Sequence, residues 1–431
     1  MKRFVWIILV LAVAAPLRGQ ITWTRCQQSA REHYPLIRQY RLVEQSTEYS
    51  VANAAKAWLP QVSFAAQGSY QSDVASFPEE MTAMYRQLGI DMKGLNRDQY
   101  RLSLEVSQTL WDGGLHRAQQ EVAKADGEFS RQNLEVEMYA LRERVNNLYF
   151  GILMLREQLT QNTLLQELLQ SNLRTVDACI EHGAATASDR QAVQVELLAA
   201  AQQRVHIESA NAAYRRMLSV MTGIPVGGTD TLETPDIRPV QPALAGGNRP
   251  ELHLFEAQRQ QFEAQKRALR ASVMPRLGLF AQGFYGNPGL NLFKDMTENR
   301  WTWNYLAGIR FQWNFGSLYT QKGSLQKLSL AQRQVDSRRE VFLFNQNLKT
   351  IRQREAIDKM NRIMADDAEI IALRTSIRRT SETRFTHGTL TVSDLLRDIH
   401  AESQARQARA LHEIEWIKNI CDLLDTINEP L

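Results

Sequence analysis

The chain carries one short stretch twice, as His182-Gly183-Ala184-Ala185-Thr186-Ala187-Ser188-Asp189 and as His387-Gly388-Thr389-Leu390-Thr391-Val392-Ser393-Asp394. The pattern that both copies share is His-Gly-x-x-Thr-x-Ser-Asp. A second pair of similar segments, residues 60–70 and residues 275–285, occurs in the same order along the chain. Similar segments in the same order indicate an internal duplication.

The two copies are separated by residues 223–250, which are rich in proline and glycine, as is typical of a linker. We therefore predict a first repeat over residues 20–222 and a second repeat over residues 251–431.

Each Gly-x-x-Thr stretch is flanked by sequence typical of long helices. Residues 115–181 contain no proline, and six apolar side chains step by four and three residues: Leu141, Val145, Leu148, Ile152, Leu155 and Leu159. Such a heptad seam predicts helices that pack against antiparallel partners. A glycine suits the end of one helix, and Thr186 or Ser188 can cap the next. We predict helical hairpins over residues 115–222 and 317–427, the first starting with an unbroken helix about 100 Å long.

Four shorter segments alternate between apolar and polar side chains, which predicts strands near residues 61–72, 100–111, 276–286 and 301–315. The third alternates less cleanly, because Phe280 and Phe284 fall on its polar side. A soluble sandwich would also alternate. A membrane barrel is favoured, because each strand is long enough to cross a bilayer at a tilt and aromatic side chains gather near the strand ends.

The barrel interpretation assigns a role to each side of the strands. The charged residues predicted to face a wet lumen are Arg101, Glu105 and Arg310. The aromatic residues predicted to lie at the membrane interfaces are Tyr100, Trp111, Trp301, Trp303 and Trp313. Four strands cannot close a barrel, and an open sheet edge cannot face lipid. We therefore expect several copies of the chain to share one barrel.

The composition excludes a bundle of transmembrane helices, since 23% of the residues are charged and 44% are hydrophobic. Residues 1–19 have the basic start, short apolar stretch and small residues of a secretory signal peptide, with cleavage expected before Gln20. A short membrane anchor is the alternative. The formal net charge of +4 gives no reason to expect nucleic acid as a partner.

No motif for catalysis or cofactor binding is found, so we expect no enzyme activity, no cofactor and no metal site. His182 and His387 could ring a metal ion in an oligomer, but solvent-exposed turn histidines without that role explain them more simply. The cysteines, Cys26, Cys179 and Cys421, are too few for a disulfide framework, and buried free thiols are expected. Cys26 and Cys421 could meet if the chain ends pack together.

The order of strand, loop, strand and long helical hairpin, the Gly113-Gly114 pair after the second strand and the repeated turn pattern together resemble the bacterial outer-membrane efflux protein family, the TolC-like channels. The resemblance covers residues 20–431. It implies a homotrimer whose twelve strands form one outer-membrane barrel and whose helices form a periplasmic tunnel. It also implies two partners, a periplasmic adaptor and an inner-membrane pump, of a tripartite efflux or type I secretion system.

The resemblance also implies a periplasmic aperture at the hairpin turns. The residues that match are Gly183, Thr186, Asp189, Gly388, Thr391 and Asp394, and Arg397 occupies a position where some members carry a second acid. Asp394 would line the constriction and pair with Arg397 one helical turn on. The alternative for Asp189 and Asp394 is charge complementarity at a helix N-terminus.

Two other functions remain open at this point. A periplasmic coiled-coil adaptor would normally have one hairpin, whereas this sequence predicts two. A secreted carbohydrate-binding sandwich is disfavoured by the long helices. The cargo, whether drug, metal or polypeptide, cannot be read from the sequence.

Overall fold

The structure, a computed structural model, describes residues 21–91, 94–228, 230–237 and 248–428. It is mostly helical with a small antiparallel sheet, which confirms the predicted class. The helices are α1 (Trp23–His33), α2 (Ile37–Lys56), α3 (Glu79–Gln87), α4 (Leu115–Tyr139), α5 (Leu141–Glu181), α6 (Ala187–Thr222), α7 (Pro250–Ser272), α8 (Leu292–Glu298), α9 (Gly316–Thr386) and α10 (Val392–Ile427). The strands are β1 (Gln61–Tyr70), β2 (Asp98–Trp111), β3 (Arg276–Asn287) and β4 (Thr302–Gln312). The predicted signal peptide and residues 238–247 of the predicted linker lie outside the described residues.

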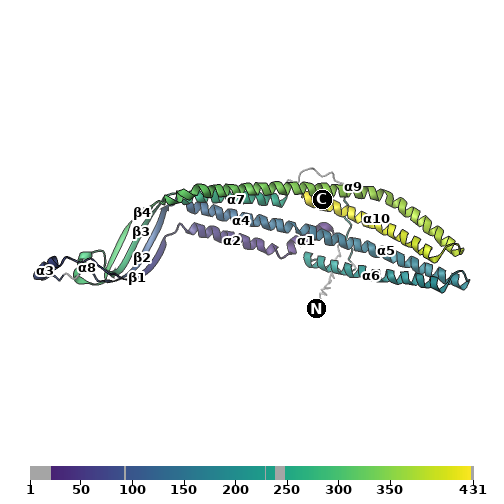
Figure 1. Cartoon of the computed structure of the whole chain (residues 1–431), viewed down its shortest axis with the longest axis horizontal. Coiled ribbons are helices and arrows are strands. Elements are labelled where there is room, and N and C mark those ends of the chain that lie inside the picture. Colours follow the sequence, from purple (N-terminus) through teal and green to yellow (C-terminus); the bar gives the residue numbers. More distant parts are fainter. Residues whose placement is uncertain (1–20, 92–93, 229, 238–247, 429–431) are drawn as a thin grey trace, which may run out of the picture. The chain divides into compact units, whose positions relative to one another are not determined.

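The four strands form one sheet in the order β1-β2-β3-β4, with every neighbouring pair antiparallel. Figure 1 shows them side by side. One row of the register joins Ala66 to Leu102, Leu102 to Tyr285, and Tyr285 to Trp303. Side chains in a row project from the same face of a sheet, so this register fixes which residues share a face.

The described residues fall into two compact units, each of which draws on both halves of the sequence. Unit 1 comprises the described residues of Met1–Tyr40, Asn133–His253 and Arg339–Leu431. Unit 2 comprises those of Arg41–Gln132 and Leu254–Arg338, and it contains the sheet.

Unit 1 has two apolar cores. The larger one joins α1, α5, α6, the end of α10 and the described part of residues 224–237, and its fully buried members include Tyr149, Phe150 and Leu218. Tyr149 donates from its hydroxyl to the carbonyl of Ile21 at 2.9 Å, so the start of the described chain is held against α5. The second core lies near the hairpin turns and includes Leu169, Val193, Phe385 and Ile399. Burial of these apolar faces explains why two such polar helical hairpins fold.

The predicted unbroken helix over residues 115–181 is wrong, because the structure ends α4 at Tyr139 and begins α5 at Leu141. Ala140 between them has ψ of −16°, shallower than an ideal helix. The Tyr139 hydroxyl donates to the carbonyl oxygen of Asp425 on α10, and the Arg142 guanidinium lies 4.8 Å from the Tyr139 ring. These contacts with α10 fix the junction at Tyr139.

Several helices were not predicted from the sequence. They are α1 and α2 before the first strand, α7 before the third, and the short α3 and α8 inside the loops that join the strands. In the part of the chain that the structure describes, no helix is both long enough and apolar enough to cross a membrane.

Candidate functional site

One face of the sheet is apolar and bare. Its large side chains are exposed in the described chain, among them Phe64 (69%), Trp303 (81%) and Tyr305 (85%). The other exposed members of this face are Val62, Tyr70, Tyr100, Leu102, Leu104, Val106, Leu279, Ile309 and Phe311. A contiguous apolar surface of this kind is rare on a water-facing protein and marks contact with a membrane or another protein.

Aromatic side chains lie at both ends of this apolar face. Near the loops, the ring of Tyr100 stacks on Trp301 at 6.0 Å between centroids, and Tyr285 lies 4.9 Å from Trp303. At the opposite end, Trp313 packs on Phe315 at 4.5 Å, and Trp111 is 49% exposed. Trp301 and Trp313 lie just before and just after β4. For a strand that rises ~3.3 Å per residue and tilts by ~40°, these two residues would be separated by roughly 30 Å along the membrane normal. The five aromatic residues predicted at membrane interfaces thus lie at the two ends of the strands.

The opposite face of the sheet is polar, and it carries the three charged residues that were predicted to face a lumen. Arg310 pairs with Glu105 at 3.2 Å. The two phenylalanines that interrupted the third alternating segment also lie on this face. The Arg101 guanidinium lies 4.3 Å from the ring centre of Phe284, and the Arg310 guanidinium lies 4.6 Å from that of Phe280. The arginines cover the apolar rings and keep their own guanidinium groups on the polar face.

The sheet has two edges that are unpaired within the described chain, since β1 and β4 each have one neighbouring strand. Every residue of β1 is exposed except Ser69, which is half-buried. Exposed edges with free backbone N–H and C=O groups favour pairing with another strand. An antiparallel four-stranded sheet leaves β1 and β4 running in opposite directions, so the β4 edge of one copy can extend the antiparallel sheet at the β1 edge of the next.

The predicted turn residues form helix caps at the ends of the two hairpins. Gly183 and Gly388 adopt φ of +73° and +71°, the left-handed conformation that ends a helix and that glycine adopts without strain. Thr186 caps α6 in a complete capping box, in which Asp189 accepts from the backbone N of Thr186 at 2.8 Å. At the start of α10, the backbone N of Asp394 donates to Thr391 Oγ1 at 3.2 Å.

These caps give both aspartates a structural role at a helix N-terminus, the alternative considered from the sequence. The predicted pair of Asp394 and Arg397 is confirmed at 3.1 Å, and the Arg397 side chain is 73% exposed. His182 and His387 are exposed at the turns. Among the described residues, no cluster of histidine, cysteine and acidic side chains could hold a metal ion.

Ionic contacts hold the second hairpin together and link it to the first. Glu402 on α10 is 4% exposed and accepts hydrogen bonds from Arg378, Thr375 and Arg406. Burial raises the pKa of Glu402, but the bonds from Arg406, Thr375 and Arg378 outweigh burial and lower the pKa below its usual value. His400 Nε2 lies 2.9 Å from Glu196 Oε2 on α6, at ion-pair distance but without hydrogen-bond geometry.

A buried polar network joins α1, α5 and α10, and sequence reasoning missed it. Asn146 is fully buried; its Oδ1 accepts from Trp23 Nε1 at 2.7 Å and Gln27 Nε2 at 2.9 Å. Its Nδ2 donates to Asp425 Oδ2 at 2.7 Å and to Asp422 Oδ1 at 3.0 Å. Burial raises the pKa of Asp425, and the Asn146 bond opposes that rise. No local pattern marks this network, because its members are far apart in the sequence.

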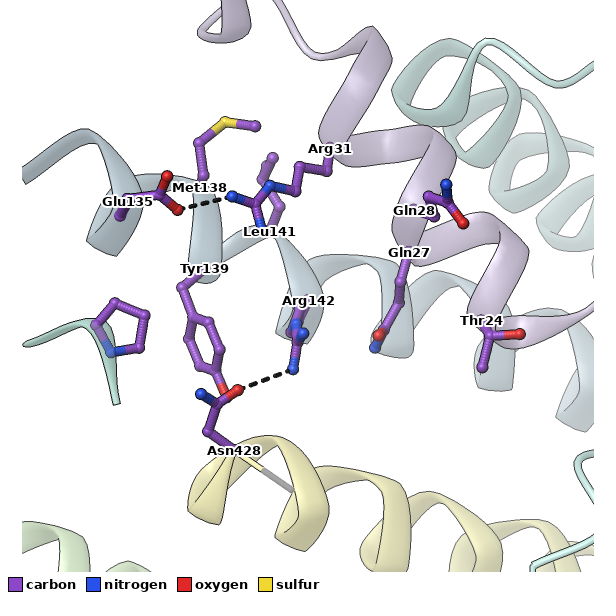
Figure 2. A pocket seen from close by; sticks show the side chains of 11 residues that line it. Thr24, Gln27, Gln28, Arg31, Glu135, Met138, Tyr139, Leu141, Arg142 and Asn428 are labelled. Carbon is purple, nitrogen blue, oxygen red and sulfur yellow. Dashed lines mark hydrogen bonds and ion pairs between the residues drawn. The ribbon is translucent and has the colours of Figure 1, made fainter. Parts of the chain in front are cut away.

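A cavity of about 410 Å³ adjoins this network (Figure 2). Its lining comes from α1, α4, α5, the first residue of α7 and the residue that follows α10, and two interactions cross it in the view. Arg31 binds Glu135 at 2.8 Å, and Arg142 donates to Asn428 at 3.4 Å. The lining is mixed polar and apolar, and these two contacts hold the α4–α5 junction to α1 and to the end of α10.

Cys26 and Cys421 are free, fully buried members of the same apolar core, as predicted for buried thiols, whereas Cys179 is only half-buried. Burial raises the pKa of Cys26 to about 12, and that of Cys421 also rises because of burial. Both thiols are therefore held in the neutral form, which is unreactive as a nucleophile.

Comparison with known proteins supports the family resemblance seen in the sequence. Residues 27–223 match the model of the family described as outer membrane efflux protein. No curated protein matches the chain by sequence.

Solved structures match almost the whole chain. The outer membrane protein VceC of Vibrio cholerae is 11% identical, with a TM-score of 0.69, over 94% of this chain and 96% of that one. The CmeC outer membrane channel of Campylobacter jejuni is 14% identical, with a TM-score of 0.67, over 94% and 85%. The MtrE outer membrane channel of Neisseria gonorrhoeae is 17% identical, with a TM-score of 0.66, over 94% and 89%. At these identities the likeness establishes the fold. Together with the match of residues 27–223 to the family model, it confirms the resemblance to the outer membrane efflux protein family that was inferred from the sequence.

Proposed function

We propose that three copies of the chain form one channel across the outer membrane and that the helical hairpins continue it as a tunnel in the periplasm. The channel is a passive duct, without catalysis, for cargo that an inner-membrane pump and a periplasmic adaptor deliver. The observation that carries this proposal is the sheet, with its bare apolar face, its charged opposite face and its two unpaired edges.

The sheet is incomplete in one copy and becomes complete in three. Edge strands cannot face lipid, because backbone groups without partners cost several kcal/mol each in hydrocarbon. Three four-stranded sheets give twelve strands, and an even number of antiparallel strands can close into a barrel. The apolar face would then contact lipid, and Arg101, Glu105 and Arg310 would face the lumen.

The helices of unit 1 also present apolar seams that lack a partner within the described residues. On α9, Val341, Phe344, Leu348 and Ile351 are all at least half exposed and step by three, four and three residues. On α6, the apolar residues that are more than half exposed include Val195, Leu198 and Val205. Heptad spacing predicts packing against another helix. We assign these seams to contacts with the neighbouring copies around the tunnel.

The hairpin turns would form the periplasmic end of the tunnel. There, Asp394 and Arg397 from three copies would form a ring at the aperture, in addition to the capping role of Asp394 at α10. The exposed turns, including Gly183, Thr186, Asp189, Gly388 and Thr391, would form the surface that the adaptor contacts.

The test uses full-length protein in isolated outer membranes. Unboiled samples in denaturing gels should give a trimer band that boiling converts to the monomer. Leu348→Glu should weaken that band because it places a charge in the exposed α9 seam, whereas Asn347→Glu adds the same charge at the adjacent polar position and should leave the band unchanged. A soluble periplasmic monomer would refute the proposal and favour an adaptor or scaffold.

A further inference from the structure

The loop between β3 and β4 folds onto the polar face of the sheet. The backbone N of Leu290 donates to Asn304 Oδ1 at 2.9 Å. Asn304 pairs in register with Phe284, and both side chains belong to the polar face. A Cβ built on Gly289 would lie 2.3 Å from Thr302 Oγ1, and Thr302 belongs to the same face. The apolar face remains free of the loop, since Trp303 between these two residues is 81% exposed.

The loop has an ordered interior of its own. Asp295 on α8 is 2% exposed and accepts from the backbone N of Gly289 at 2.7 Å. Asn299, after α8, accepts from Asn287 Nδ2 at 2.7 Å and donates to Asn96 Oδ1 in the β1–β2 loop at 2.9 Å. The buried Asp295 carboxylate is satisfied by the loop backbone, and Asn299 links the loop to the β1–β2 loop. These two interactions restrict the loop to one position.

The loop lies beside a cationic group. Phe284 is 2% exposed beneath the loop and the Arg101 guanidinium, which lies 4.3 Å from its ring centre. The ionic side chains on the polar face of the strands comprise three arginines and one glutamate: Arg101, Arg276, Arg310 and Glu105. Three arginines and one glutamate give the face a net charge of +2 in every copy. Glu105 pairs with Arg310 and Arg276 lies at the far end of the strands, so Arg101 is the arginine nearest the loop.

We infer that residues 288–300 and Arg101 form a constriction at the outer mouth of the channel that favours anionic over cationic solutes. Lys294 and Arg300 offset Asp295 and Glu298, so Arg101 leaves the constriction with a charge of +1 per copy. This inference rests on the proposed function, which turns the polar face into the lumen. The strands connect to the long helices at one end and to these loops at the other. The loops therefore lie at the end of the sheet opposite the one that leads into the helices, and three copies place three loops and three Arg101 side chains around one opening.

Ion selectivity tests the charge of the constriction. Purified full-length trimers in planar bilayers, measured in a gradient of potassium chloride, should prefer chloride. Arg101→Gln should reduce the chloride-to-potassium permeability ratio about two- to fourfold. This estimate assumes that the substitution removes three charges about 10 Å from the pore axis, at a Debye length of about 10 Å. Arg276→Gln is the matched control, because it removes the same charge from the polar face at the other end of the strands, where Arg276 pairs in register with Gln312.

A cross-link tests the position of the loop. Gly289→Cys combined with Thr302→Cys should form a disulfide in the assembled protein, identified in a proteolytic peptide by mass spectrometry, and the disulfide should leave conductance unchanged. Asn304→Ala should raise conductance, because it removes the acceptor that holds Leu290. Failure of the cross-link, or conducting trimers whose selectivity is the same in wild type and Arg101→Gln, would overturn this inference and leave the proposed function standing. The absence of any conducting trimer would overturn both.

Discussion

Asn146→Ala tests the polar network that holds α1 and α10 to α5. The substitution leaves the buried Trp23 N–H without its acceptor, at a cost of about 1–3 kcal/mol. It also removes a hydrogen bond to the Asp425 carboxylate, which is worth about 1.5–3 kcal/mol because the acceptor is charged. Since the two losses share one side chain and need not add, we expect a total of about 3–5 kcal/mol.

Asn162→Ala is the matched control on the same helix. Asn162 is also buried, and its Nδ2 donates to the carbonyl of Ala200 at 3.0 Å. That carbonyl keeps a second donor, Gln166 Nε2 at 3.3 Å, so no buried group loses its last partner. The expected cost is about 1 kcal/mol.

Thermal unfolding of the purified protein in detergent, followed by tryptophan fluorescence, measures the difference. At about 2–4 °C per kcal/mol, Asn146→Ala should lower Tm by roughly 6–20 °C and Asn162→Ala by roughly 2–4 °C. A single scan rate is needed, because large assemblies commonly unfold irreversibly. Equal shifts for the two variants would refute the reasoning.

The pH dependence provides a second check on Asn146→Ala. A carboxyl whose folded pKa is raised stabilises the fold at pH below its unfolded pKa, and this stability is lost as pH rises through the folded pKa. Losing the Asn146 bond raises the pKa of Asp425 further. The deficit of Asn146→Ala should therefore be smaller near pH 4 than near pH 8, and a deficit that grows on acidification would contradict the assignment.

Three further predictions concern the hairpins. Glu402→Gln should lower the free energy of unfolding by about 2–3 kcal/mol at pH 7, because Arg378 loses a charged partner. Since the pKa of Glu402 is lowered in the folded protein, the stability advantage of the wild type should shrink as pH falls from about 4.3 through the folded pKa. A difference in unfolding temperature that stays constant with pH would contradict this prediction. Gly388→Ala should cost about 1 kcal/mol through its positive φ, whereas Gly323→Ala, in the interior of α9 with open space around it, should be neutral or stabilising in the same assay. Asp394→Ala should change single-channel conductance and cation block if the aspartate lines the aperture; unchanged values, with only the loss of stability expected for a missing cap, would leave Asp394 its capping role alone.

Periodicity made the sheet predictable from the sequence. Alternation in β4 placed Trp303 and Tyr305 on one face and Arg310 on the other, and the register bears this out. The phenylalanines that broke the alternation in β3 were explained only by the structure, because their rings are covered by arginines from neighbouring strands. Pairing between distant strands is not visible in a local pattern.

The helical part was predictable where local signals dominate. Glycine and threonine at the turns predicted the caps that Gly183 and Thr186 form, and one-turn spacing predicted the pair of Asp394 and Arg397. The break at Ala140 was missed, because it depends on contacts of Tyr139 with α10 rather than on a proline or glycine.

Closure of three sheets into one barrel is the central claim, and a cross-link between the edges of neighbouring copies tests it most directly. Cysteine replaces Ala66 on β1 and, in separate variants, Tyr305, Ala307 or Ile309 on β4, all of which belong to the apolar face. Controls combine Ala66→Cys with Leu306→Cys or Gly308→Cys, which belong to the opposite face. Oxidation in intact outer membranes should give a covalent trimer for at least one apolar-face pair and not for the controls. A covalent trimer from none of these pairs, with the protein present in the membrane, would contradict the shared barrel.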